Sequence, residues 1–211
     1  MLDLILPLEC GGCGAPGTRW CSACASAWRV GVDQPHLVAP RQDPGVPVFA
    51  LGRYAGARRA AIVALKEHRR TDLTAPLAGA LALGVHRLLR WGLVSLPLVL
   101  VPAPTRRSSA RRRGGDPVLR TAAAAVAAHP GIAVVPALRM RAGARDSVGL
   151  NSRGRERNVA GRVLLTRRVP AGAEVLVVDD IVTTGATARE SVRVLQTSGA
   201  RVTGVLTLAH A

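Results

Sequence analysis

Residues 174–189 (EVLVVDDIVTTGATAR) constrain the fold more than any other part of the chain. They open with the apolar run 175–178, which is short and β-branched, as in strands that are buried on both faces of a parallel sheet. Asp179 and Asp180 follow this run, and a turn rich in Thr and Gly leads into a helical pattern through Val192 and Leu195. The stretch therefore predicts a strand, a tight turn and a helix in immediate succession.

The turn between this strand and helix has the properties of a phosphate site. Backbone N–H groups at the start of a helix point toward one place, where the helix dipole also favours an anion. Gly185 permits close approach of the backbone. Hydroxyl groups can donate to phosphate oxygens. The residues that we expect to form this cradle are Thr183, Thr184, Gly185, Ala186 and Thr187.

The two acids suggest a neighbouring group with hydrogen-bond donors. Asp179 and Asp180 would repel a phosphate in the same pocket, so sugar hydroxyls are the more suitable partners. Each hydrogen bond to an ionised carboxylate contributes roughly 1.5–3 kcal/mol. Together with the turn, the acids predict a sugar-phosphate site. The alternative is a turn whose Asp and Thr residues only cap a helix, but one such residue is enough for a cap.

All four cysteines lie close to the N-terminus with the spacing C-x2-C-x7-C-x2-C: Cys10, Cys13, Cys21 and Cys24. Two such pairs on short turns can present four thiolates tetrahedrally, and zinc is their usual occupant. Four thiolates leave no open position, so the metal would be structural. The alternatives are an iron–sulfur cluster and a pair of disulfides. We predict a zinc knuckle over residues 1–30 and a proline-rich connector over residues 31–50.

Residues 51–211 are expected to form the main domain. Helical spacing predicts helices over residues 57–67, from a cap at Asp72 through Leu89, and from Pro117 onward. Apolar runs predict strands at 48–51, 96–101, 132–138, 163–165, 175–178 and 202–208. This alternation predicts an α/β fold with a parallel sheet flanked by helices.

Basic residues mark further candidate sites. The strand over residues 96–101 runs into a loop rich in Pro, Ser and Arg, where Arg106 and Arg107 predict a second anion site. The alternative is a solvated arginine loop. Lys66 ends the first helix of the main domain and is the only lysine in the chain, which suggests a specific role. A cation that merely suits the end of a helix is the alternative.

Residues 139–162 form a long charged segment between two predicted strands. A loop of this length in a compact domain is usually a lid or a disordered piece. An arginine-rich lid over a pyrophosphate would exclude water and add positive charge.

The net charge of +16 is carried almost entirely by arginine. It reflects either a compositional bias toward Arg and Ala or an anionic partner, such as a phosphorylated substrate or nucleic acid. Aromatic residues make up 2% of the chain, which argues against tight binding of single strands. We find no membrane span and no secretory signal in the sequence, so we expect a cytoplasmic protein with reduced cysteines.

Taken together, these features resemble the ComF family (ComF/GntX), which joins a four-cysteine zinc knuckle to a type I phosphoribosyltransferase domain. The residues that carry the resemblance are the DDIVTTGAT motif at 179–187, Leu65-Lys66, Val101-Pro102-Ala103-Pro104, Arg113-Gly114, Leu150, Arg157, Asn158 and Val159. The chain departs from the family at Glu67, where Phe is usual, and at residues 115–117, where Phe-Asn-Gln is frequent. The family also commonly carries a Gln near Ser147.

The resemblance implies that the chain binds phosphoribosyl pyrophosphate (PRPP) with Mg²⁺, transfers the phosphoribosyl group to a nucleophile and releases pyrophosphate. Asp179 and Asp180 would hold the ribose hydroxyls and stabilise positive charge at C1′, and residues 183–187 would hold the 5′-phosphate. Mg²⁺ would bind mainly to substrate oxygens. The expected catalytic residues are Asp179, Asp180, Lys66 and Arg106; Arg107 would join Lys66 and Arg106 at the pyrophosphate, and Arg155, Arg157 and Asn158 would belong to the lid.

Two other functions fit the same residues. One is a PRPP- or nucleotide-binding module without turnover. The other is a nucleic-acid-handling protein, such as an accessory to DNA uptake. The sequence specifies neither the acceptor nor the oligomeric state, and an oligomer is compatible with it.

Overall fold

The computed structural model describes residues 8–105, 115–141 and 161–211. The described helices are α1 (Ser22–Ala27), α2 (Gly56–Glu67), α3 (Thr74–Arg90), α5 (Pro117–Val126) and α7 (Ala186–Thr197), with a 3-10 turn, η1 (Thr71–Leu73). The described strands are β1 (His36–Val38), β2 (Val48–Ala50), β3 (Leu98–Pro102), β4 (Ile132–Val134), β5 (Leu138–Met140), β6 (Val163–Leu165), β7 (Glu174–Val182) and β8 (Arg201–His210). The expected α/β class is confirmed.

The main sheet has six strands in the order β1-β2-β8-β7-β3-β4. Its strand pairs are parallel except for β1 with β2. β7 therefore lies between β8 and β3, and residues 175–178 are fully buried. A strand covered on both faces can be apolar without alternation, which is the pattern that the sequence shows.

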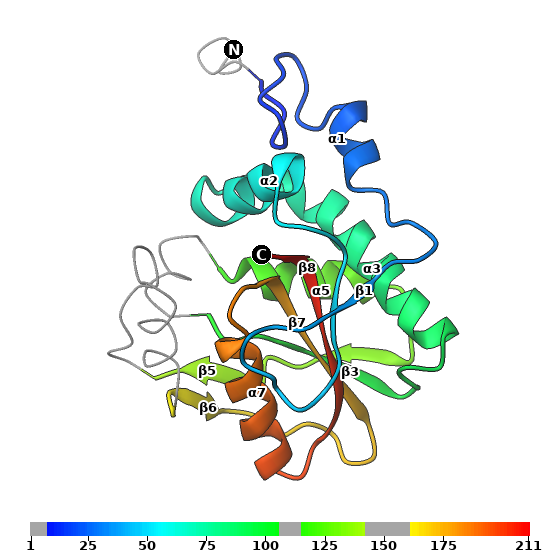
Figure 1. Ribbon diagram of the computed structural model, residues 1–211, viewed down its shortest axis with the longest axis vertical. Helices are drawn as coiled ribbons and strands as arrows, with labels where there is room; N and C mark the ends of the chain where they lie inside the picture. Colours follow the sequence, from blue (N-terminus) through cyan, green and yellow to red (C-terminus); the bar gives the residue numbers. More distant parts are fainter. Residues whose placement is uncertain (1–7, 106–114, 142–160) are drawn as a thin grey trace.

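Helices cover both faces of this sheet (Figure 1). One face carries a core formed with α2, α3 and α5, to which Leu176 and Val178 of β7 contribute. The opposite core is formed with α7 and with β5 and β6, and it includes Val175 and Val177. The side chains of β7 thus alternate between two separate cores, which fixes the register of this strand.

The N-terminal segment lies over α2, at the end of the molecule away from β5 and β6 (Figure 1). From there the chain enters the main sheet earlier than the sequence suggests. β1 and β2 fall within residues 31–50, the predicted connector, and β2 pairs with β8. The loop between β1 and β2 is irregular and rich in proline, as expected.

Three details of the predicted elements are wrong. The strand expected over residues 132–138 is divided into β4 and β5, because Pro136 between them lacks an N–H for a ladder. β6 forms where expected, but it pairs with β5 in a separate antiparallel sheet. Asp72 does not cap α3, because the N-cap of this helix is Leu73. The carboxylate of Asp72 instead accepts two hydrogen bonds from Arg70.

Among the residues that the structure describes, we find no helix with the length and apolar content needed to cross a bilayer.

Two glycines of α3 provide a test of how the helix packs on the sheet. A methyl group at Gly84 would lie 2.8 Å from Cδ2 of Leu51, which is fully buried. A methyl group at Gly79 would meet none of the described atoms within 4 Å. We expect Gly79→Ala to raise the free energy of unfolding by about 0.5–1 kcal/mol. Gly84→Ala should lower it, because overpacking costs roughly 1–3 kcal/mol. Urea denaturation of both variants checks this, and equal effects at the two positions would contradict it.

Candidate functional site

The two acids lie inside β7, at the point where the neighbouring strand leaves the sheet. β3 pairs with β7 as far as Pro102 opposite Val178, whereas β7 continues along β8 to Val182. The sequence predicted that Asp179 and Asp180 follow the strand, and this detail is wrong. The acids nevertheless lie at the carboxyl edge of β3, where ligands of parallel sheets commonly bind.

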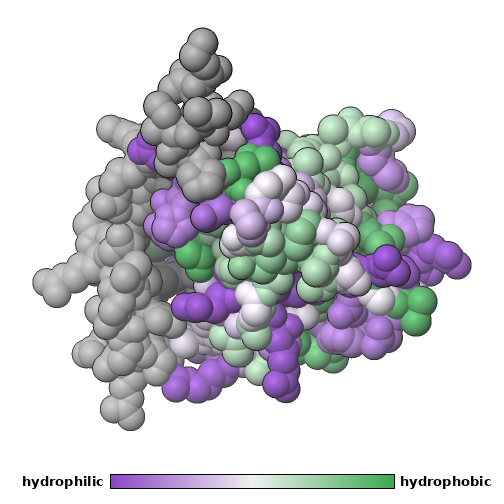
Figure 2. Space-filling view, turned by 90° about the horizontal axis from the view of Figure 1, so that it is seen from above, coloured by the Kyte–Doolittle hydropathy of each residue, from purple (hydrophilic) through white to green (hydrophobic). Residues whose placement is uncertain are grey.

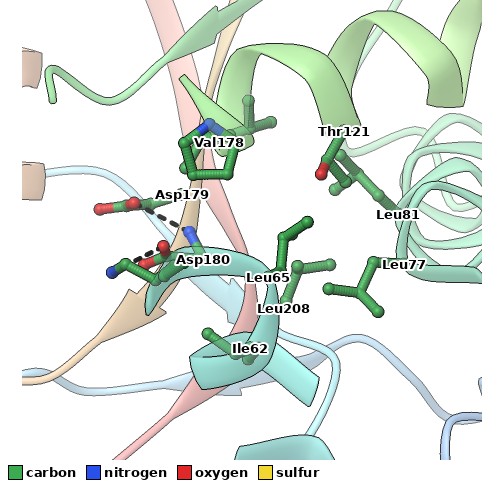
Figure 3. A pocket seen from close by; sticks show the side chains of 12 residues that line it. Ile62, Leu65, Leu77, Leu81, Thr121, Val178, Asp179, Asp180 and Leu208 are labelled. Atoms are coloured by element: carbon green, nitrogen blue, oxygen red, sulfur yellow. Dashed lines mark hydrogen bonds and ion pairs between the residues drawn. The ribbon is translucent and has the colours of Figure 1, made fainter. Parts of the chain in front are cut away.

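Lys66 reaches one of the two acids from α2. Its Nζ lies 2.8 Å from Oδ2 of Asp180, and the two side chains are 29% and 11% exposed. The backbone N–H of Asp180 donates to Oδ1 of Asp179 over 2.8 Å, and both contacts are drawn in Figure 3. A lysine from the first helix of the main domain is thereby brought to an acid more than a hundred residues later in the chain.

An apolar pocket adjoins the acid pair (Figure 3). It is a shallow hollow between α2, α3, α5, β7 and β8. Its apolar walls include Ile62, Leu65, Leu77, Leu81, Val118 and Leu208. Asp179, Asp180 and Lys66 line the same pocket. The acids are consequently backed by hydrocarbon, a setting in which a carboxylate loses hydration.

Burial raises the pKa of Asp179 well above its usual range. The negative charge of Asp180 raises it further, and Asp116 acts in the same direction. The charge of Lys66 and the N–H of Asp180 act in the opposite direction. The site therefore holds two neighbouring carboxylates with one nearby described cation, Lys66, an arrangement that favours binding of a group rich in donors or positive charge.

The turn after β7 leads directly into the first turn of α7. Gly185 is the N-cap of α7 and has a left-handed backbone, with φ of 86°. The hydroxyl of Thr184 accepts a hydrogen bond from Ala186 N at 3.4 Å. Thr183 is exposed and Thr187 is half-buried. The N–H groups of the first turn of a helix have no partner within the helix, so the start of α7 can offer donors to an anion.

A second segment packs directly on this turn. The N–H of Gln42 donates to the carbonyl oxygen of Thr184 over 2.8 Å. A methyl group on Gly185 would collide with the carbonyl oxygen of Gln42 and would lie 2.8 Å from Cβ of Pro40. The positive φ and the packing of residues 40–42 therefore require a glycine at position 185, whether or not a phosphate binds there. The sequence did not predict a role for residues 40–42, because nothing in a proline-rich connector indicates that it packs on a turn far along the chain.

The end of β3 lies beside the acids. Ala103 N donates to the carbonyl oxygen of Val178 over 2.8 Å, so residues 102–105 enter their loop next to Asp179. At the far end of this loop, Asp116 caps α5 by accepting from Val118 N and Leu119 N. The remaining predicted residues of the loop lie outside the described part of the chain, namely Arg106, Arg107, Arg113 and Gly114.

The predicted lid residues also lie outside the described part of the chain: Leu150, Arg157, Asn158 and Val159, together with Arg155. The two described ends of this segment are held together, because Arg141 N donates to the carbonyl oxygen of Arg162 over 2.7 Å. Gly161 N donates to Oε1 of Glu190 on α7 over 3.0 Å. The segment therefore starts and ends beside the helix that follows the Thr- and Gly-rich turn.

The four cysteines form a cluster in which all sulfur atoms lie within 4.8 Å of one another. The Sγ atoms of Cys13 and Cys21 are 3.6 Å apart. Zinc–sulfur bonds of about 2.3 Å would give tetrahedron edges of roughly 3.8 Å. All four cysteines belong to the described residues and are free rather than disulfide-bonded. The cluster could thus hold a metal ion such as zinc.

Backbone N–H groups stabilise the thiolate form of one cysteine in this cluster. The N–H groups of Gly12 and Cys21 point to Sγ of Cys10 at 3.5 and 3.4 Å. Burial raises the pKa of Cys10, but hydrogen bonds from the backbone outweigh burial and bring this pKa to about 6. Burial and the neighbouring thiols raise the pKa of Cys24. One sulfur is therefore readily available as a thiolate, the form that binds metals.

A scan against models of known protein families finds no match to this chain, and a search of curated proteins finds no match either. Conclusions about function therefore depend on the residues of the site itself.

Substitution by asparagine should affect stability differently at the two acids, because only Asp180 pairs with Lys66. A carboxyl whose pKa is raised by folding stabilises the protein at low pH, and this contribution is lost as the pH rises through the folded pKa. Above the pKa that Asp179 has in the unfolded chain, this residue therefore costs stability. Asp179→Asn should raise the unfolding midpoint at pH 8, and the gain should disappear toward pH 4.

Asp180→Asn is the matched comparison. It breaks the ion pair with Lys66, which costs stability, but it also relieves the repulsion on Asp179, so its unfolding midpoint at pH 8 should lie below that of Asp179→Asn. Denaturation by urea at pH 4, 6 and 8 measures both effects. A loss of stability in Asp179→Asn at pH 8 would contradict the raised pKa.

Proposed function

We propose that this protein binds PRPP, or a closely related ribose phosphate, and transfers the phosphoribosyl group to an acceptor with release of pyrophosphate. The observation that carries the proposal is the order of groups along one strand, turn and helix. Two carboxylates on β7 are followed directly by a turn lined with hydroxyls at the start of α7. This order matches a pentose that carries hydroxyls next to a phosphate ester.

Each part of the ligand has a chemically suitable partner. Asp179 and Asp180 accept hydrogen bonds from the ribose hydroxyls, and residues 183–187 donate to the 5′-phosphate. Lys66, together with Arg106 and Arg107, supplies positive charge to the pyrophosphate. Mg²⁺ bound to the substrate oxygens neutralises part of the charge on the leaving group. Closure of the segment with Arg155, Arg157 and Asn158 excludes water.

The electrostatics of the acids favour the transition state. Transfer from PRPP develops positive charge around C1′ of the ribose. The two carboxylates are held close together beside an apolar pocket, where their mutual repulsion costs free energy. Developing positive charge relieves this repulsion, and fixed carboxylates do not need to reorganise as solvent would. The acids therefore stabilise the transition state more than the neutral ring of the ground state.

The N-terminal cysteines hold a structural zinc ion in this proposal, and the chain belongs to the ComF family with a type I phosphoribosyltransferase domain. The spacing of the sulfur atoms supports zinc, and the four-thiolate set leaves no position for a substrate. The cytoplasm, where cysteines stay reduced, is the compartment that suits such a site.

A second candidate is a module that binds PRPP or a nucleotide without turnover. Asp116 favours this candidate, because it lies in the loop where the family frequently has Phe-Asn-Gln. Its carboxylate caps α5 and places a negative charge near Asp179. A negative charge in this place disfavours an incoming pyrophosphate.

Calorimetric titration with PRPP and Mg²⁺ tests the binding site. We expect saturable binding to the unaltered protein. Asp179→Asn combined with Asp180→Asn should weaken binding by about a hundredfold or more, because each acid contributes roughly 1.5–3 kcal/mol. Asp33→Asn, at a side chain that is 73% exposed, is the control and should bind normally. Absence of heat with the unaltered protein would overturn the proposal.

The same preparation, incubated with PRPP, Mg²⁺ and a panel of purine and pyrimidine bases, separates the two candidates. Pyrophosphate release with one of the bases supports the transferase. Binding of PRPP without release in the presence of any base supports the non-catalytic module.

Metal analysis tests the zinc site. We expect about one zinc ion per chain, lost together with part of the thermal stability in Cys10→Ser, because structural zinc contributes directly to folding. Cys24→Ser should behave in the same way, whereas Ser26→Ala, two residues further along α1, should retain the metal. Iron in place of zinc, or protein without free thiols, would contradict this assignment.

A further inference from the structure

Residues 8–30, which we call the N-terminal module, contact the first turn of the helix that carries Lys66 and the turn that follows this helix. α2 extends from Gly56 to Glu67, and Lys66 lies in its last turn. Its inner face joins the core through Ala61, Ile62 and Leu65. Polar contacts from the N-terminal module reach its first turn and the turn after it.

Trp28 holds the first turn of α2. Its indole N–H donates to the carbonyl oxygen of Ala57 over 3.4 Å. In the opposite direction, Arg58 donates to the carbonyl oxygen of Ala27 over 3.2 Å, and its guanidinium lies 4.6 Å from the centroid of the Trp28 ring. Trp28 is 4% exposed and Arg58 is 8% exposed. A cation on an indole face that is removed from water is attracted to the ring more strongly than an exposed one.

The turn that follows α2 is fixed by the same module. Arg70 forms an ion pair with Asp72 at 2.8 Å and donates to the carbonyl oxygen of Arg19 over 3.3 Å. Gly11 lies directly on Leu73, because a methyl group at Gly11 would be 2.6 Å from Cδ1 of this leucine. The module thus contacts the first turn of α2 and the turn that follows this helix.

Each of these contacts adjoins the cysteine cluster. Trp28 closes α1, and its backbone N–H donates to the carbonyl oxygen of Cys24 over 3.0 Å. The thiol of Cys21 caps the other end of α1. Gly11 lies between Cys10 and Cys13 in the sequence, and its N–H donates to the carbonyl oxygen of Arg19 over 3.0 Å. A metal bound by the four sulfurs would therefore lock the segments that contact α2.

We propose that the metal-binding N-terminal module positions Lys66 at Asp180, with Trp28 and Arg58 as positioning residues that act through α2. The ion pair itself belongs to the ligand-free protein, whereas its effect on PRPP binding rests on the proposed function. The module is in this view part of the ribose-phosphate site, although it contacts none of the acids directly.

The ionisation of Asp179 reports the position of Lys66. The charged groups of the described chain that act on Asp179 are Asp180 beside it, Asp116 at the start of α5 and Lys66 on α2. Lys66 is the cation in this set, and its charge lowers the pKa of Asp179. Movement of α2 away from β7 should therefore raise this pKa.

Carbon-detected NMR of aspartate carboxyl groups in the full chain with its metal bound measures this pKa, with Asp179→Asn to assign the signal. Lys66→Gln should raise the pKa of Asp179. Trp28→Phe, which removes the indole N–H and keeps an aromatic ring, should raise it by a smaller amount. Trp28→Phe in the Lys66→Gln background should add no shift. Trp91→Phe, at an exposed tryptophan after α3, is the matched control and should leave the pKa unchanged.

If Trp28→Phe retains its metal and the pKa of Asp179 is unchanged, the proposal is overturned. It is also overturned if Trp28→Phe shifts this pKa equally in the presence of Lys66 and in the Lys66→Gln background. If Trp28→Phe does not fold, Arg58→Gln takes its place and is judged by the same two criteria.

Calorimetry with PRPP and Mg²⁺ on the same proteins tests the functional consequence. Trp28→Phe should weaken binding severalfold in the presence of Lys66 and have no effect in the Lys66→Gln background. If the unaltered protein does not bind PRPP, the proposed function fails, and the NMR result still decides whether the module positions Lys66.

Discussion

The site depends on the placement of two carboxylates beside a partly apolar pocket. Ionised acids in such a place repel each other and lose hydration, as the raised pKa of Asp179 indicates. The ion pair of Lys66 with Asp180 reduces this cost in the ligand-free protein. A bound sugar and its developing positive charge would reduce it further. The surrounding elements can be understood as the supports of this one electrostatic arrangement.

Three segments that are distant in the sequence provide these supports. The N-terminal module holds α2 and thereby Lys66. Residues 40–42 pack on the turn that begins α7, where a side chain at Gly185 would collide with them. Gly161, at the end of the charged segment after β5, is anchored to α7 through Glu190. Residues 40–42 therefore hold the candidate phosphate turn, and Gly161 holds the helix after it; such preorganisation reduces the entropic cost of binding.

Local sequence patterns predicted the elements well where a physical signal is strong. The run 175–178 is a buried strand, the helical spacing after Gly185 is α7, and a helix does begin at Pro117, where Asp116 provides the cap. Predictions failed where the same residues are compatible with more than one local structure. Asp72 is of a type that often caps helices, but its carboxylate pairs with Arg70 instead. Pro136 divides into two strands an apolar run that otherwise resembles one.

The sequence by itself determined the kind of groups that the site contains: a pair of acids, a hydroxyl-lined turn, one lysine and four closely spaced cysteines. These follow from residue identity and short spacing, which are local properties. Only the tertiary structure decided that Lys66 meets Asp180, that the connector packs on Gly185 and that the cysteine module holds α2. Such contacts join residues far apart in the chain, and they arise from the packing of helices on the sheet, which no local pattern encodes.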